Sequence, residues 1–332
     1  MDIREIRVAD NAFADWFATY HAATVADDPT GPQWTEDEAR VLFEPHEYRD
    51  RVMWLASEES RPIGAAILSL PLRDNLQLGE PEVYVHPDAR RRGIGTALLH
   101  VVERAAHTHG RRSLLTYLSS GMGTPQTAGT LFAERHGFTR RIDEVRRVLN
   151  PPFPFDAIDE AVAAARPYAA DYELVTWRDQ APDKYVHEYA RLEARLSTDA
   201  PLGDLDYEGE VWDEARIRKS EERCKLMDRG LWLAAAVAPD GQMAGLTEVT
   251  ISKSSDRDAF QGTTIVDPEH RGHRLGILLK AANFKQVYAD RPGIEQIWTW
   301  NAESNSHMIA VNETMGYRVE GWDRGYQRDV RA

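Results

Sequence analysis

The chain repeats one pattern of residues, and this repeat limits the possible folds more than any other feature of the sequence. Residues 85–99, VHPDARRRGIGTALL, align with residues 266–280, VDPEHRGHRLGILLK, at an offset of 181 residues. Further matching positions recur in the same order: Gly64 with Gly245, Trp54 with Trp232, and Gly137 with Gly316. Repeats of roughly 20–50 residues build solenoids, whereas this one spans about 140 residues, so we expect duplication of a whole domain.

Each copy predicts the same order of elements. A helical region comes first, followed by two strands joined through a turn, ESRPIG in one copy and PDGQMAG in the other. A third strand rich in Val and Ile leads through an Arg-Gly loop into an amphipathic helix. A fourth strand, a helix ending at glycine and a last strand complete the copy. We expect an α/β protein of two tandem domains, each with a mixed, mostly antiparallel sheet flanked by helices.

The boundary between the copies falls in the segment PPFPFDAIDEAVAAARP, residues 151–167. Its prolines end the first copy, and its Ala-rich middle indicates a linker helix. We therefore expect an N-terminal domain in residues 1–150, the linker helix in residues 151–170 and a C-terminal domain in residues 171–332. The last strand of each copy is expected to close its own domain.

Charge and composition exclude several classes of protein. The formal net charge of −14 at pH 7 disfavours nucleic acid as a partner, because binding a duplex requires a basic face. Cys224 is the one cysteine, so no intrachain disulfide can form, which suits a reducing compartment. The longest apolar run, residues 231–238, is much shorter than the ~20 residues of a membrane span. We expect a cytoplasmic protein, monomeric or homodimeric, without membrane partners.

The Arg-Gly loops, residues 90–95 and 271–276, predict an anion site. A tight glycine turn that opens a helix exposes several backbone N–H groups, and these add to the helix dipole in attracting a phosphate. Arginine contributes charge and forked donors. A plain turn with solvated arginines is the alternative. No GxxxxGK[ST] motif occurs, and Leu98 replaces the third glycine of a dinucleotide fingerprint.

These residues also carry a resemblance. The pattern V-x-P-x-x-R-x-x-G-x-G, between a strand and a helix, resembles the acyl-CoA-binding signature of the GNAT superfamily of N-acetyltransferases. Residues 299–317, TWNAESNSHMIAVNETMGY, resemble the second signature of that family. The layout is similar to that of two-domain GNAT proteins such as the mycothiol synthases.

The resemblance implies two positions for acetyl-CoA, one in each copy. The pyrophosphate is expected at the Arg-Gly loop, and the pantetheine arm is expected to pair with the preceding strand. In copy one the implied residues are Val83, Tyr84, Val85, Arg90, Arg91, Arg92, Gly93, Ile94, Gly95 and Thr96. In copy two they are Thr264, Ile265, Val266, Arg271, Gly272, His273, Arg274, Leu275, Gly276, Ile277, Asn301 and Asn305.

Neither copy matches the family pattern fully. Where the family has a tyrosine that can protonate the leaving thiolate, copy one has Ala133 and copy two has Asn312. Asn312 is the candidate to hydrogen-bond the thiolate. Arg274 replaces a glycine of the loop, which costs energy if its φ is positive, although its side chain could contact phosphate. Because the C-terminal domain is the active one in mycothiol synthases, the resemblance favours copy two as the catalytic copy.

The expected reaction is direct attack of a small-molecule amine on the acetyl thioester. Because such an amine is protonated at neutral pH, a carboxylate must accept its proton. The candidates are Glu248 in copy two and Glu80 or Glu82 in copy one; each could instead face solvent on its strand. A metal is not expected. The acidic run 199–214 could attract a cationic amine, and a catalytically degenerate acyl-CoA-binding protein remains the alternative function.

Overall fold

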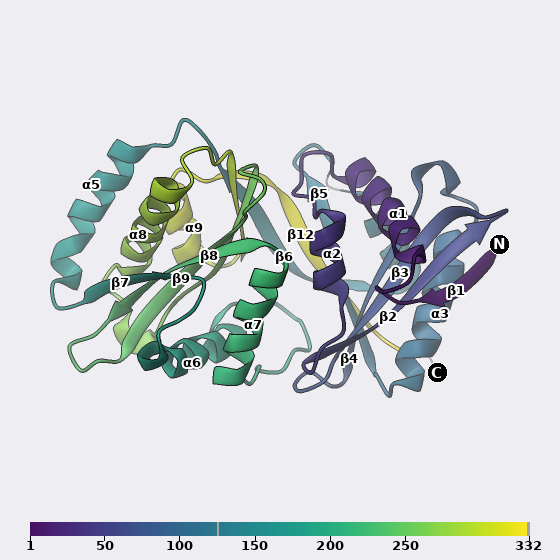
Figure 1. The fold of residues 1–332 in the computed structure, drawn as a ribbon, viewed down its shortest axis with the longest axis horizontal. Coiled ribbons are helices and arrows are strands. Elements are labelled where there is room, and N and C mark those ends of the chain that lie inside the picture. The colour runs from purple at the N-terminus through teal and green to yellow at the C-terminus, as the bar shows by residue number, and fades with distance from the viewer. Residues whose placement is uncertain (125, 331–332) are drawn as a thin grey trace. The chain divides into compact units, whose positions relative to one another are not determined.

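The computed structural model describes residues 1–124 and 126–330, and these divide into two compact units (Figure 1). Unit 1 comprises the chain up to Glu144, the segment Gly203–Glu208 and the chain from Gly321 onward. Unit 2 comprises Val145–Leu202 and Gly209–Glu320. The strands β6 (Thr139–Leu149) and β12 (Arg318–Asp329) each contribute one end to each unit.

Both units follow the predicted order of elements. The other elements of unit 1 are β1 (Asp2–Ile6), α1 (Ala12–Asp27), α2 (Glu36–Phe43), β2 (Arg49–Glu58), β3 (Arg61–Pro71), β4 (Leu78–Val85), η1 (Pro87–Ala89), α3 (Ile94–Thr108), β5 (Ser113–Gly121) and α4 (Ala128–Arg135). Those of unit 2 are α5 (Phe155–Ala165), η2 (Arg166–Ala169), β7 (Glu173–Arg178), α6 (Asp183–Asp199), α7 (Glu214–Leu226), β8 (Arg229–Val237), β9 (Met243–Ser252), β10 (Asp258–Val266), η3 (Pro268–His270), α8 (Leu275–Asp290), β11 (Gln296–Ala302) and α9 (Ser306–Thr314).

The sheet of each unit is antiparallel except at one junction, where two strands run parallel and soon separate. In unit 1 the order is β1-β2-β3-β4-β5-β12, and among the described residues β4 pairs with β5 through Leu78 and Gly79 alone. In unit 2 the order is β7-β8-β9-β10-β11, and in the described part of the chain β10 pairs with β11 over residues 258–260 alone. Beyond these short pairings, an edge of this kind can accept another extended segment.

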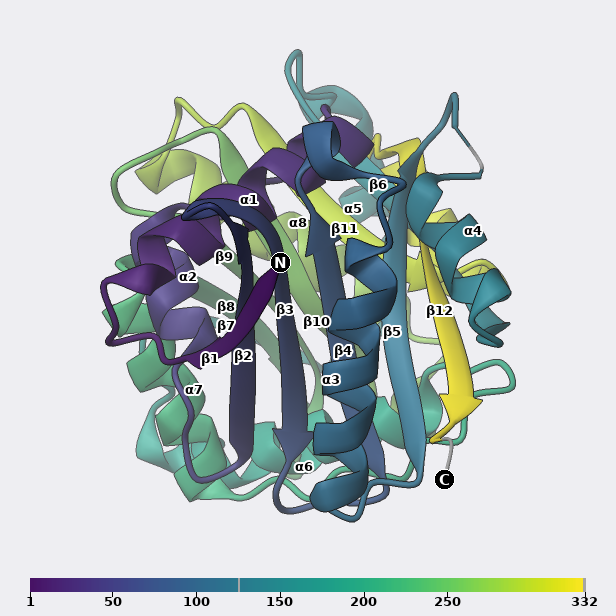
Figure 2. The same ribbon diagram turned by 90° about the vertical axis from the view of Figure 1, so that its right-hand side faces the viewer.

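Helices cover both faces of each sheet. In unit 1, α3 lies across β3 and β4 (Figure 2). An apolar stripe of α3 that includes Leu98 and Val102 packs into the core on this face of the sheet. The opposite face carries α1 and α2, whose Trp16 and Phe43 are buried. In unit 2, α6 and α7 cover one face and α8 the other. The expected linker helix forms as α5, but it packs into the core of unit 2 through Ile158 and Ala165.

The last strands do not close their own copies as the sequence led us to expect. Residues 321–329 of β12, at the end of copy two, pair with β5 in unit 1 from Gly321↔Gly121 to Asp329↔Ser113. The second half of β6, at the end of copy one, belongs to unit 2. Tyr326 is buried in the core cluster of unit 1 that also contains residues of α3. The contiguous domains 1–150 and 171–332 therefore do not coincide with the compact units, because strand partners are chosen by long-range packing.

Within the described residues, no helix combines the length and the apolar character that crossing a membrane requires.

Candidate functional site

The two Arg-Gly loops have the same backbone conformation. In copy one, Arg91 (φ 66°) and Gly93 (φ 84°) are left-handed, and in copy two Gly272 (φ 88°) and Arg274 (φ 55°) occupy the matching positions. Gly93 and Arg274 are the N-caps of α3 and α8, and neither receives a side-chain capping bond. The expected strain at Arg274 is confirmed, because a left-handed conformation costs a side-chain-bearing residue roughly 1–2 kcal/mol.

A groove with a volume of about 900 Å³ lies beside the loop of copy one. This volume is typical of a small-molecule site. The lining from β4, the loop and α3 consists of Val83, Tyr84, Val85, Arg90, Arg91, Gly93, Ile94, Gly95 and Thr96. Of the copy-one residues expected at the cofactor, Arg92 is not part of this lining, and its guanidinium pairs instead with Glu58 at 2.6 Å.

The far wall of the groove comes from α4 and the residues before it. It consists of Gln126, Thr127, Ala128, Gly129, Leu131, Phe132, Arg135 and His136. The His136 ring lies 4.3 Å from the Phe132 ring, and its Nε2 is 3.2 Å from Thr96 Oγ1, so it joins both walls. Sequence reasoning missed Arg135 and His136, although the repeated glycine at 137 marked the end of this helix. Arg91 and Arg135 make this part of the groove cationic.

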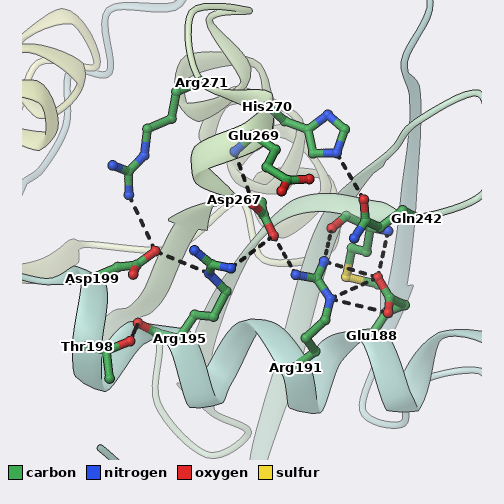
Figure 3. Close-up of polar contacts among 11 residues, drawn as sticks. Glu188, Arg191, Arg195, Thr198, Asp199, Gln242, Asp267, Glu269, His270 and Arg271 are labelled. Carbon is green, nitrogen blue, oxygen red and sulfur yellow. Dashed lines mark hydrogen bonds and ion pairs between the residues drawn. The ribbon is translucent and has the colours of Figure 1, made fainter.

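Arg90 and its repeat partner Arg271 are both held by a carboxylate. Arg90 forms two hydrogen bonds to Asp27, at 2.7 and 2.9 Å, and its Nε donates to the Val85 carbonyl. Arg271 pairs with Asp199 at 3.5 Å (Figure 3). Asp27 and Asp199 end the first helix of their copies, α1 and α6. Both arginines therefore join the loop to a helix, Arg90 through two hydrogen bonds and Arg271, which stays exposed, through one longer contact.

The residue that precedes the copy-two loop region, Asp267, is also held by side chains of α6, as Figure 3 shows. Asp267, 2% exposed, accepts a hydrogen bond from Arg191 and lies 3.8 Å from Arg195. Burial opposes ionisation of this carboxyl, but the hydrogen bond from Arg191 and the neighbouring charges outweigh it and lower its pKa. Asp267 therefore stays ionised and ties the start of the loop to α6.

Two side chains of the copy-two loop, which itself stays exposed, contact the end of α5 and the η2 segment after it. His273 Nδ1 lies 2.8 Å from the Tyr168 carbonyl oxygen. The guanidinium of Arg274 stacks 4.0 Å from the Tyr168 ring and donates to the Ala164 carbonyl. Arg274 thus contacts protein groups in unit 2, and the expectation that its side chain compensates by meeting a phosphate is not supported.

Copy two contains a buried polar network where copy one is apolar. Lys280 Nζ donates to Asn312 Oδ1 at 2.5 Å, Asn312 Nδ2 donates to Asn301 Oδ1, and Arg147 donates to the same oxygen. Burial, and then the charge of Arg147, lower the pKa of Lys280 to about 7. The related positions in copy one are Leu99 and Ala133, both buried.

This network corrects the role expected for Asn312. Its side chain is 0% exposed and bonded at both ends, so it is not placed to meet a thiolate in an open groove. Asn305, expected at the cofactor, caps α9 by accepting a hydrogen bond from the Met308 N–H. The copy-two asparagines therefore have structural partners that the sequence did not predict.

The copy-one carboxylates lie on β4 beside the groove. Glu82 accepts a hydrogen bond from the hydroxyl of Tyr84, a groove residue. Burial is the largest of the causes that raise the pKa of Glu82. Glu80 forms an ion pair with Arg49 instead. Of the two, Glu82 has the environment of a general base.

The copy-two carboxylate Glu248 is half-buried beneath α6 and does not face open solvent. It accepts a hydrogen bond from Tyr189 at 2.7 Å, and burial raises its pKa. It lies at an irregularity of β10 between Gln261 and Thr264, where a Cβ on Gly262 would meet Glu248 Oε1 at 2.5 Å. Glu248 is therefore next to the strand segment 264–266 that the sequence assigned to the cofactor.

Two further observations concern the cysteine and possible metal ligands. Burial raises the pKa of Cys224 to about 12, so its thiol is a poor nucleophile. Within residues 1–124 and 126–330, no group of three or more His, Cys, Asp or Glu side chains is arranged to hold a metal ion.

The comparisons with known proteins agree on one family. Residues 49–140 match the model of an acetyltransferase (GNAT) domain. Over 255 residues the chain is 27% identical to a mycothiol acetyltransferase of Salinispora arenicola, covering 74% of this chain and 72% of the relative. Over 296 residues it is 24% identical to a mycothiol acetyltransferase of Acidothermus cellulolyticus, covering 85% and 80%.

Solved structures extend the likeness to the full length. A tandem GNAT protein from the clavulanic acid biosynthesis pathway matches with a TM-score of 0.79 at 26% identity, covering 100% of this chain and 99% of that one. A GCN5-related N-acetyltransferase from Sphaerobacter thermophilus matches with a TM-score of 0.69 at 18% identity, covering 99% of this chain and 96% of that one. At this identity the match supports the fold alone.

Proposed function

Because the chain is an N-acetyltransferase of the GNAT superfamily with two domains in tandem, we propose that it moves an acetyl group from acetyl-CoA to an amine of a small molecule. We further propose that acetyl-CoA binds in the groove of unit 1. The observation that carries this assignment is the groove itself, about 900 Å³, lined by the loop, the free edge of β4 and α4.

The residues of the groove fit the parts of acetyl-CoA. The N-terminus of α3, opened by left-handed Arg91 and Gly93, offers amides and a helix dipole to the pyrophosphate. Arg91 and Arg135 add positive charge. Since β4 pairs with β5 only through Leu78 and Gly79 among the described residues, the edge of residues 83–85 is open to the amide groups of the pantetheine arm.

In the proposed reaction, the amine nitrogen forms a bond to the acetyl carbon and the bond from that carbon to sulfur breaks. Glu82 first takes a proton from the substrate ammonium, directly or through water, because only the neutral amine can attack. The second proton, which the nitrogen loses as the amide forms, passes to the leaving thiolate, so that free thiol is released. A backbone N–H of residues 83–85 stabilises the oxyanion. The raised pKa of Glu82 suits this role, because a base is most effective with a pKa near the working pH.

A second arrangement places the reaction in unit 2, with Glu248 as the base. The observation that favours it is the position of Glu248 at the β10 irregularity, where Tyr189 holds the carboxylate next to Thr264. Against it, Asn312 is bonded to Lys280 and the side chains of the copy-two loop contact α5 and η2.

Calorimetric titration with acetyl-CoA separates the two arrangements. A Cβ on Gly95 would lie 3.2 Å from Phe132 and 3.5 Å from Val85, so Gly95→Trp fills the groove. The matched variant is Gly276→Trp, at the repeat-related position in α8. We expect one site in the wild type, at least about a 100-fold loss of affinity in Gly95→Trp, consistent with displacing a bound ligand, and little change in Gly276→Trp.

The reverse pattern would move the donor to unit 2, and wild-type affinity in both variants would contradict both arrangements. A protein that binds acetyl-CoA but releases no free thiol with any member of an amine panel would instead be an acyl-CoA-binding sensor.

A further inference from the structure

A pair of carboxylates lies inside unit 2, away from both Arg-Gly loops. Glu193 of α6 is 8% exposed, and its Oε1 has no hydrogen-bond partner among the described residues. Its Oε2 accepts a hydrogen bond from the Thr263 hydroxyl at 3.2 Å. Glu248 of β9 is held by Tyr189 at 2.7 Å. Glu248 also accepts a hydrogen bond from the Thr263 backbone, so both carboxylates meet the same residue where α6 packs on the sheet, and after burial the charge of Glu248 is the largest cause that raises the pKa of Glu193.

This arrangement is costly unless something neutralises it. A buried carboxylate oxygen without a donor loses its hydration and gains nothing in return, and a second carboxylate nearby increases the cost. The charge of Arg216 lowers the pKa of Glu193, but the Arg216 guanidinium pairs with Glu210 at 3.1 Å. A ligand that brings both positive charge and N–H donors would satisfy the pair.

The chemistry of the pair selects the class of ligand. Ca²⁺ and Mg²⁺ require six or more oxygen ligands, and no cluster of three potential metal-binding side chains occurs here within the described part of the chain. A primary ammonium has three N–H donors and one charge, which suits the unpartnered Oε1 of Glu193 together with the negative charge of Glu248, whose carboxylate is held by Tyr189 and the Thr263 backbone. Thr263 and Gly262 belong to the β10 irregularity, which brings the backbone against Glu248 and fixes that side of the pair.

We propose that Glu193 and Glu248 bind the primary ammonium group of a small amine in unit 2, with Tyr189 and Thr263 holding the two carboxylates in position. The site is separate from the groove of unit 1, where we place acetyl-CoA, and it shares Glu248 with the second arrangement described above. It assigns a binding role to Glu193, a residue that neither the repeat nor the loop motif indicated.

The test is calorimetric titration of the full chain with 1,4-diaminobutane, without acetyl-CoA, at 0.15 M salt. We expect saturable binding to one site. The diol of the same length, 1,4-butanediol, lacks the charge and is expected not to bind. Tetramethylammonium has the charge but no N–H donors, and we expect it to bind at least tenfold more weakly than the diamine.

Variants locate the site. Glu193→Gln keeps the shape but removes one charge, and we expect at least a tenfold loss of affinity for the diamine. The control is Glu222→Gln, which removes the same charge from an exposed position on α7 and is expected to bind as the wild type does. Tyr189→Phe, which frees Glu248, is expected to weaken binding by a smaller factor. Acetyl-CoA titration of each variant tests the proposed function separately, so that its failure is distinguished from failure of the amine site.

Two results would overturn the proposal. If the wild type does not bind the diamine at millimolar concentration, Glu193 and Glu248 do not form an ammonium site. If Glu222→Gln weakens binding as much as Glu193→Gln, the diamine is attracted by the overall negative charge and not by the pair.

Discussion

At the scale of single residues, the environment of a side chain decides its role more than its type does. Glu80 and Glu82 share a strand, yet one is neutralised by Arg49 while the other is buried and bonded to Tyr84. Arg90 and Arg92 belong to the same loop, but Arg90 pairs with Asp27 and Arg92 pairs with Glu58. Of these residues, Glu82 has the raised pKa that proton transfer requires.

We predict that Glu82→Gln lowers kcat by about 10²–10⁴, the usual contribution of a general base, and leaves the acetyl-CoA Kd unchanged. In the wild type, kcat/KM is expected to rise with pH as Glu82 ionises, because burial raises its pKa and only the ionised form accepts a proton. The variant is expected to lose this limb of the pH profile. Steady-state thiol release measured across pH checks both points. Unchanged kcat in Glu82→Gln, with the loss found in Glu248→Gln, would place the reaction in unit 2.

At the scale of elements, the two copies use one framework and fill it differently. In both copies a parallel pair of strands separates after a short contact, and left-handed residues precede the helix that follows. Copy one keeps an apolar contact between α3 and α4, while copy two joins α8 to α9 through Lys280 and Asn312. A buried lysine at such a contact makes the stability of unit 2 depend on pH.

The sign of this dependence follows from the lowered pKa of Lys280, about 7 in the folded state against an ordinary value of 10.5. Between these values the unfolded chain binds more protons, so the Lys280 contribution makes stability rise with pH. The limit is about 1.4 kcal/mol per pH unit. We predict that from pH 7 to pH 9 the wild type gains about 2 kcal/mol relative to Lys280→Met.

Urea unfolding at the two pH values measures this difference. Lys285→Met, which removes an exposed lysine of the same helix that pairs with Asp159, is the control and is expected to follow the wild type. Parallel pH dependence in the wild type and Lys280→Met would show that Lys280 does not lose its proton in the folded state.

At the scale of the whole molecule, the exchanged last strands make each unit depend on the other copy of the sequence. Residues 321–329 form the partner of β5, and Tyr326 is buried in the core cluster that also contains residues of α3. The segment Gly203–Glu208 also joins unit 1, where the Glu208 N–H donates to Asn75 at 2.7 Å. Residues 321–329 are thus part of the unit that contains the groove.

We predict that a chain ending at Glu320 loses acetyl-CoA binding, although every groove residue is still present, because β5 becomes an unpaired edge and the core cluster of unit 1 loses Tyr326. Addition of a peptide of residues 321–332 is expected to restore part of the binding. Calorimetry with acetyl-CoA, before and after adding the peptide, tests this. Full binding by the truncated chain would show that copy one folds without the exchanged strand.

The sequence by itself determined the features that depend on local chemistry. The repeat predicted the order of elements in both units, the glycines and arginines predicted the left-handed loops, and the motif indicated the β4 and α3 walls of the groove around Gly93 and Gly95. These features follow from backbone conformation and from periodic burial, which neighbouring residues encode.

Only the tertiary structure decided which distant segments meet. The exchange of the last strands, the stacking of Arg274 on Tyr168, the burial of Asn312 with Lys280 and the pairing of Glu193 with Glu248 all join residues far apart in the chain. Any free strand edge can accept β6 or β12 by backbone bonding, so the choice between them depends on the packing of whole faces. That packing energy is summed over many contacts and cannot be assigned to any single motif.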